Sequence, residues 1–202
     1  MFSPKTRQEL KDAVELCLTL SDDCSIGPHG PIGTWDVSRV TDMQSIFRNS
    51  RFNGDISTWN VARVTDMRMM FYRSAFNGDI SNWDVSQVTD MTHMFAWTPA
   101  FNGDISTWNV ARVTDMRGMF ARAFAFNGDI SAWNVARVTD MATMFYNAKS
   151  FRRSLCGAAW VNLKADKTAM FYKSPGSISK SPCTTATTTT TGTNVDSVLP
   201  VC

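Results

Sequence analysis

The sequence lacks several features that define large classes of protein. It contains no apolar run near the roughly 18 residues that span a bilayer, so we expect no insertion into a membrane. Its 20 basic residues exceed its 18 acidic residues by only two charges, which gives no bulk electrostatic reason to expect a nucleic-acid partner. It has only two histidines, His29 and His93, in distant parts of the chain. We expect both to face solvent, without a catalytic or ligand role.

Cysteine patterns typical of metal sites are also missing. None of the five cysteines, Cys17, Cys24, Cys156, Cys183 and Cys202, forms a C-x-x-C pair, so we expect no zinc site. They lie toward the two ends of the chain, which suits disulfide-locked caps in an oxidising compartment. Scattered reduced thiols fit the sequence equally well. The odd number leaves at least one cysteine unpaired within a monomer.

The first residues, MFSPKTRQEL, lack the charged and apolar regions of a signal peptide. This leaves two alternatives, an intracellular protein or a secreted protein whose leader is missing from this sequence. We favour the second, and therefore expect an extracellular or cell-surface location.

The dominant feature that is present is a repeated phrase. FNGDISTWNVARVTDM begins at Phe52 and returns with few changes at Phe76, Phe101 and Phe126. Its tryptophan occurs at intervals of 24, 24, 25 and 25 residues. A fixed period in the twenties is typical of a solenoid, in which each coil stacks on its neighbours. We count five clear coils and a degenerate sixth that begins at Trp160.

Spacing within the repeat predicts an α/β solenoid with two kinds of segment. The pattern I-x-x-W-x-V over residues 56–61 matches the apolar spacing of a leucine-rich repeat and predicts a short parallel strand. In the next segment, Val64, Met67, Met70 and Phe71 follow one another at intervals of three, three and one, which predicts a short helix or 3₁₀ turn. The FNGD sequence then predicts a turn.

The solenoid is one of three predicted parts of the chain. Residues 1–33 form an N-terminal cap, in which 6–20 read as an amphipathic helix with Thr6 and Glu9 in capping-box spacing. Residues 34–174 form the solenoid. Residues 175–202 form a threonine-rich flexible tail.

Several polar rows run along the predicted solenoid. The aspartate row at Asp55, Asp79, Asp104 and Asp129 supplies one carboxylate per coil, too few for calcium, so we expect these residues to stabilise turns. The row Arg39, Arg63, Gln87, Arg112 and Arg137 predicts pairing with nearby aspartates, with an anion-binding stripe as the alternative.

The outward positions of the predicted strands are the candidate binding site. They carry small polar side chains in a regular grid, which suits docking of a large partner. These candidates are Ser57, Thr58, Asn60, Ser81, Asn82, Asp84, Ser106, Thr107, Asn109, Ser131 and Asn134.

The sequence closely resembles the BspA-like leucine-rich repeat surface proteins. The resemblance rests on FSPKTRQELKDAV from Phe2, GTWDVSRVTDM from Gly33, and the recurring F-N-G-D-I-S-x-W-[ND]-V-x-x-V-T-D-M-x-x-M-F. It implies right-handed, leucine-rich-repeat-like coils and a non-catalytic role in adhesion or protein binding at the cell surface. It supplies no catalytic residues.

We therefore expect a surface interaction module without enzymatic activity, metal or cofactor. Its partner is expected to be a protein or a glycan, and the sequence leaves its oligomeric state open. The alternative is a structural or ice-associating extracellular repeat protein, because a regular polar grid can also order water. Among the predicted strand positions, however, threonine occurs only at Thr58 and Thr107.

Overall fold

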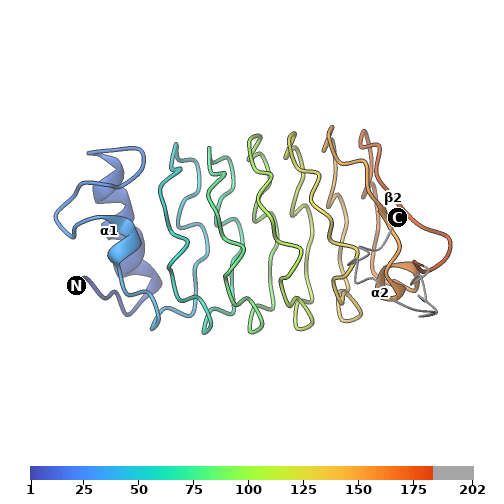
Figure 1. Ribbon diagram of the computed structural model, residues 1–202, viewed down its shortest axis with the longest axis horizontal. Helices are drawn as coiled ribbons and strands as arrows, with labels where there is room; N and C mark the ends of the chain where they lie inside the picture. Colours follow the sequence, from blue (N-terminus) through green and yellow to red (C-terminus); the bar gives the residue numbers. More distant parts are fainter. Residues whose placement is uncertain (184–202) are drawn as a thin grey trace, which may run out of the picture.

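The computed structural model describes residues 1–183, which form a row of stacked coils (Figure 1). Helix α1, Arg7–Leu18, lies at one end of the row, and the short helix α2, Ala158–Val161, lies near the other. Residues 184–202 of the predicted threonine-rich tail lie outside the described residues. No helix within residues 1–183 combines the length and the apolarity that crossing a membrane requires.

Successive coils are joined by a backbone ladder. Parallel bridges connect Asp42 to Asp66 and continue one coil at a time to Asp166. Along the ladder, the amides of Met67, Met69 and Phe71 donate to carbonyls of the next coil at 2.9–3.0 Å. We call the stretches that form it the ladder segments: residues 42–50, 66–74, 90–98, 115–123, 140–148 and 166–174.

The helix or 3₁₀ turn predicted over the ladder segments is wrong. Met69 and Arg73 have left-handed φ values of 55° and 54°, which interrupt a right-handed helix. Tight turns form instead, in which the Met70 amide donates to the Met67 carbonyl at 3.2 Å. Such turns bring residues three apart onto one side, as a helix does, so the apolar spacing did not distinguish the two.

The predicted strands over residues 56–61 and their copies are also wrong. The Trp59 amide donates to the Ile56 carbonyl at 3.1 Å, which makes this stretch a turn. The cause is local: the carboxylate of Asp55 and the amide oxygen of Asn60 each accept a hydrogen bond from the backbone two residues on, and so favour turns. Within residues 1–183 the only strands are β1, Ser154–Leu155, and β2, Ser177–Ile178, which pair in parallel.

Aromatic and methionine side chains fill the core in columns. Phe71 stacks on Phe76 of the same repeat at 4.1 Å and on Phe95 of the next coil at 5.5 Å, between ring centroids. The indole of Trp83 donates to the Ile56 carbonyl at 3.1 Å, and equivalent bonds recur in other coils. Each buried large side chain contributes about 1.5–3 kcal/mol, and because neighbouring coils supply the contacts, the coils stabilise one another.

Helix α1 closes the first coil. Thr6 is its N-cap, and its hydroxyl accepts from the Glu9 amide at 3.2 Å, while the Glu9 carboxylate accepts from the amide of Lys5, one residue before the N-cap, at 2.8 Å. Its apolar side is buried against the coils. Its basic side chains also reach the first ladder segment, where Arg7 donates to the Gln44 carbonyl at 2.8 Å and Lys11 to the Ser45 carbonyl at 3.5 Å.

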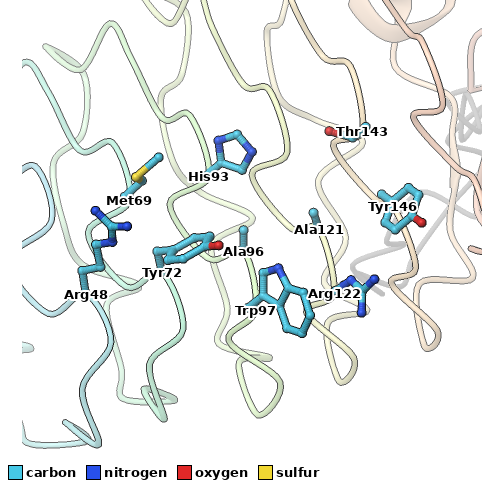
Figure 2. A pocket seen from close by; sticks show the side chains of 10 residues that line it. All are labelled: Arg48, Met69, Tyr72, His93, Ala96, Trp97, Ala121, Arg122, Thr143 and Tyr146. Carbon is cyan, nitrogen blue, oxygen red and sulfur yellow. The ribbon is translucent and has the colours of Figure 1, made fainter.

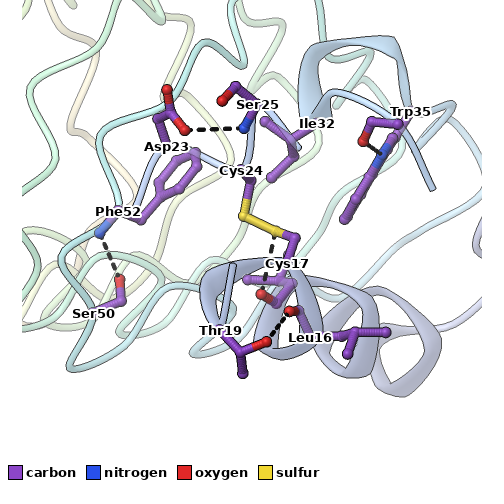
Figure 3. The surroundings of a disulfide bond; sticks show 12 residues. Leu16, Cys17, Thr19, Asp23, Cys24, Ser25, Ile32, Trp35, Ser50 and Phe52 are labelled. Atoms are coloured by element: carbon purple, nitrogen blue, oxygen red, sulfur yellow. Dashed lines mark hydrogen bonds between the residues drawn. A yellow bond between two sulfur atoms is a disulfide. The ribbon is translucent and has the colours of Figure 1, made fainter. Parts of the chain in front are cut away.

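A disulfide reinforces each end. Cys17, in α1, is bonded to Cys24, in the loop that leads to the short 3₁₀ helix η1, Ile32–Thr34 (Figure 3). Cys156 is bonded to Cys183. The structure therefore favours disulfide-locked caps over scattered reduced thiols for these four residues. Cys202 lies outside the described residues.

Candidate functional site

The predicted binding residues lie on one side of the coil stack, in the turns before the ladder segments. We call this side, formed by residues 55–63 and their copies, the turn face. Thr58, Asn82, Thr107 and the Asn60 row are exposed, whereas the equivalent serines are half-buried or, in the case of Ser131, buried. Ser131 therefore does not belong to an exposed site.

Most polar groups of the turn face are bonded to the protein itself. The Ser57 hydroxyl donates to Asp55 at 2.7 Å, and the Thr58 hydroxyl donates to the Gly33 carbonyl at 2.8 Å. The side chains of Asn60, Asp84 and their copies at 109 and 134 accept from the amide two residues on. This face therefore uses much of its hydrogen-bonding capacity to hold its own turns.

The aspartates of the turn face act as predicted, as turn stabilisers. Hydrogen bonds from the Ser106 amide and hydroxyl lower the pKa of Asp104, and the Ser57 hydroxyl and amide lower that of Asp55. Within residues 1–183, no three histidine, cysteine, aspartate or glutamate side chains are grouped so as to hold a metal ion.

The predicted pairing of the arginine row with aspartates is not observed. Arg112 donates to Gln87 at 2.7 Å, and no ion pair among the described residues includes Arg39, Arg63, Arg112 or Arg137. None of these four arginines lines either of the two best-formed hollows of the described chain.

A hollow of about 340 Å³ lies instead over the ladder segments (Figure 2). No aspartate or glutamate lines it. Its lining residues are Arg48, Met69, Tyr72, His93, Ala96, Trp97, Ala121, Arg122, Thr143 and Tyr146. The hollow therefore combines aromatic walls with positive charge.

The hollow exists because small residues interrupt two rows of larger ones. The position after the core phenylalanine of each ladder segment is Arg48, Tyr72, Ala96, Ala121, Tyr146 and Tyr172 in successive coils. The two alanines leave a gap of two coils between tyrosine walls. In the second row, Gly118 leaves room for the His93 ring, because a Cβ there would lie 2.7 Å from that ring.

Cations and aromatic rings alternate across the hollow. The guanidinium of Arg48 lies over the Tyr72 ring at 5.5 Å, and that of Arg122 lies over Trp97 at 4.1 Å. We define the cation–aromatic strip as the six residues joined by such contacts: Arg48, Tyr72, Arg73, Trp97, Arg122 and Tyr146. Tyr172, stacked on Tyr146 at 5.4 Å, extends it to Lys173.

Two sets of arginines on the ladder segments differ in their partners. Arg68 and Arg117 pair with Asp66 and Asp140 respectively, and these carboxylates raise the arginine pKa values. The arginines of the strip form no ion pair with any residue of the described chain. Their positive charge is therefore open to an external anion.

His93 is half-buried in the hollow, contrary to the expectation that it faces solvent. Burial lowers its pKa, and the charge of Arg117 lowers it further. Its buried Nδ1 has no hydrogen-bond partner within residues 1–183. His29 is also not simply solvent-facing, because it stacks on Phe2 with ring centroids 4.0 Å apart.

Sequence reasoning did not identify any residue of the hollow as a binding residue. The signal available was departure from the repeat: the positions that follow M-F in each coil vary, while the turns are nearly constant. These variable positions recur in the same register of successive coils, and they contain all the residues of the strip.

Stacked coils of 24 to 26 residues, built on a shared backbone ladder, define a repeat protein. The chain belongs to the family described as "Mycoplasma protein of unknown function, DUF285", whose model matches residues 22–109 and 73–181. No match was found among curated proteins or among solved structures.

Proposed function

We propose that this chain is a BspA-like surface protein with right-handed, leucine-rich-repeat-like coils, acting as a non-catalytic binding module for a protein or glycan outside the cell or at its surface. Membership of a repeat family is consistent with this proposal. The two disulfides support it as well, because such bonds persist in oxidising compartments.

The observation that carries the proposal is the hollow on the ladder segments. Binding sites are commonly concave, with aromatic walls and a few polar groups that fix the ligand. Trp97 is 39% exposed beside guanidinium groups that have no carboxylate partner in the described chain. We therefore place the binding site here in preference to the turn face.

The arrangement supports binding more than catalysis. A catalytic site requires a nucleophile or acid–base pair within hydrogen-bond reach. His93 makes no hydrogen bond to a hydroxyl or carboxylate of residues 1–183, and the lining of the hollow contains no carboxylate.

The experiment measures binding to a panel of extracellular proteins and polysaccharides, using the whole chain and two variants. One variant, Ala96→Tyr with Ala121→Tyr, fills the hollow with the residue that occupies the same row at Tyr72 and Tyr146. The other places tyrosine at Asn60, Asp84 and Asn109 on the turn face. Circular dichroism spectra should match for all three proteins.

We expect the filled hollow to weaken binding at least tenfold and the turn-face variant to bind normally. Loss of binding only in the turn-face variant would move the site to the residues predicted from the sequence. Unchanged binding by both variants would exclude both sites. No binding to any panel member would reject the proposed function.

The alternative, ice association, has one observation in its favour. Threonines at 41, 65, 89, 114 and 139 form a regular row across the coils. The hydroxyls of the last four, however, donate to carbonyls of the preceding coil at 3.1–3.2 Å, which removes these protons from contact with ice. A thermal hysteresis measurement tests it, and no hysteresis is the result expected if the binding proposal is correct.

A further inference from the structure

We infer that the cation–aromatic strip binds an acidic polysaccharide through its pendant carboxylate or sulfate groups. This inference rests on the proposed function, because it names the ligand class of the same site. It follows from the guanidinium groups, which have no carboxylate partner within residues 1–183, from their spacing along the stack, and from the hydrogen-bonded backbone beneath them.

The guanidinium groups of the strip are positioned but not neutralised. Trp97 lies between Arg73 of the preceding coil, at 5.2 Å, and Arg122 of the following coil, at 4.1 Å. Stacking holds the planar guanidinium by its face and leaves the N–H groups at its edge. Those N–H groups fit carboxylate and sulfate oxygens in a bidentate manner.

The cations are arranged along a line. The strip crosses successive ladder segments, so it runs along the axis of the coil stack (Figure 1, Figure 2). At about 4.8 Å per coil, Arg73 and Arg122 are separated by about 10 Å, and Arg122 and Lys173 by the same distance. A linear polymer with regularly spaced anions matches this row better than a single small anion does.

The backbone beneath the strip argues against a peptide ligand. A peptide that adds to a sheet edge requires free backbone amides and carbonyls. Here the amides of Met69 and Phe71 already donate to the next coil at 2.9 Å. The strip therefore offers side chains alone, which suits a polymer recognised by its pendant groups.

The aromatic rings argue against single-stranded nucleic acid. Bases bind such proteins by stacking on open aromatic faces. Arginines lie over the Trp97 ring from both neighbouring coils, and Arg48 and Arg73 both lie over the Tyr72 ring. Bases would have to displace these cations, whereas an anionic sugar contacts their free edges.

The test compares binding of the whole chain to polygalacturonate, dextran sulfate, neutral dextran and poly(dT), by titration at low and high salt. The strip variant is Arg73→Gln with Arg122→Gln. Its matched control is Arg63→Gln with Arg137→Gln, which removes the same charge from two exposed arginines outside the strip. Circular dichroism and thermal unfolding check that both variants fold.

We expect binding to one or both acidic polysaccharides, none to neutral dextran, and weakening at high salt. Each lost charge-assisted contact should weaken binding about tenfold, so the strip variant should lose about a hundredfold and the control less than threefold. Preference between the two acidic polymers identifies carboxylate or sulfate as the natural group. Arg73→Lys with Arg122→Lys keeps the charge but loses bidentate geometry, and should fall between wild type and the glutamine variant.

Equal losses in the strip variant and its control would overturn the inference, because net charge alone would then explain binding. Poly(dT) binding that is tighter than that of either polysaccharide and sensitive to the strip variant would assign the strip to nucleic acid. A further outcome is that the chain binds neither acidic polymer and yet binds another member of the panel in a way that Ala96→Tyr with Ala121→Tyr abolishes. That result would reject this ligand class and leave the proposed function intact.

Discussion

The turn face and the side formed by the ladder segments, which we call the ladder face, are built by the same coils but differ in what their side chains do. On the turn face the repeat is nearly constant, and residues such as Asp55 and Asn60 hold their own backbone. On the ladder segments the backbone is held by the next coil, so outward side chains are free to vary. Variation there has produced Trp97 in one coil and Gly118 in the next.

This difference shows where a repeat protein can acquire a specific site. Side chains that stabilise each coil must recur in every coil, whereas side chains freed by backbone bonding need not. Most of the binding candidates predicted from their regularity form hydrogen bonds within the protein itself. The irregular positions form the hollow.

The largest difference in stability is expected between substitution of a buried core tryptophan and substitution of the exposed Trp97. Trp108 is 4% exposed and donates from its indole to the Ile80 carbonyl, so Trp108→Ala should lower the free energy of unfolding by about 3–5 kcal/mol. Trp97→Ala on the ladder face should cost less than about 1 kcal/mol. Urea unfolding measures both, and similar losses would contradict the division of roles.

A smaller contrast concerns the left-handed positions of neighbouring ladder segments. Gly118→Ala should destabilise by about 1–2 kcal/mol, because φ is +59° and the new Cβ would meet the His93 ring. Thr143 has the same conformation, with φ of 59°, although it is β-branched. Thr143→Asn should therefore stabilise by about 0.5–1 kcal/mol. Thermal unfolding measures the change in stability for each variant. Two stabilising or two destabilising substitutions would refute the argument.

Polar side chains on the two faces should differ less in their contribution to the free energy of unfolding. Asn109→Ala removes the acceptor of the Ala111 amide, at 3.2 Å, and should lower stability by roughly 0.5–1.5 kcal/mol. Arg122→Ala leaves no backbone group unpaired and should cost about 0.5 kcal/mol or less. The same unfolding assay ranks the two variants, and a larger loss for Arg122→Ala would show that the strip is mainly structural.

The smallest expected effect is the pH dependence contributed by His93. Its pKa is lowered from 6.5, so the unfolded chain binds this proton more readily than the folded chain. Stability should therefore fall as pH decreases below about 6.5 and stay constant above it. His93→Asn should remove this step, as measured by unfolding between pH 5 and 8. Asp55 and Asp104 of the turn face, whose pKa values are lowered from 3.8, act only at more acidic pH.

The sequence predicted the period and helix α1, because each depends on a local or strictly repeated signal. The capping box at Thr6 and Glu9 is one such signal, and Trp59 and its copies are another. The segment types were not predictable in the same way. Intervals of three residues fit a helix and a series of tight turns equally, until the left-handed φ of Met69 is known.

The candidate site was less predictable than the fold. Its residues come from five coils, and the rows to which they belong change in residue type from coil to coil, so no recurring motif marks them. Their proximity depends on the register of the ladder, which places Tyr72, Trp97 and Arg122 in adjacent coils. The regular arginine row, by contrast, lacks the predicted carboxylate partners within residues 1–183.

The ladder also determines how the length of this protein can change. Each internal segment donates to one neighbour and accepts from the other, so a whole inserted coil would satisfy the bonds that its insertion interrupts. A partial coil would leave amides unpaired and break the core columns. Gene duplication can therefore lengthen the array in steps of one repeat, and each step would move one end of the strip about 5 Å further from the other.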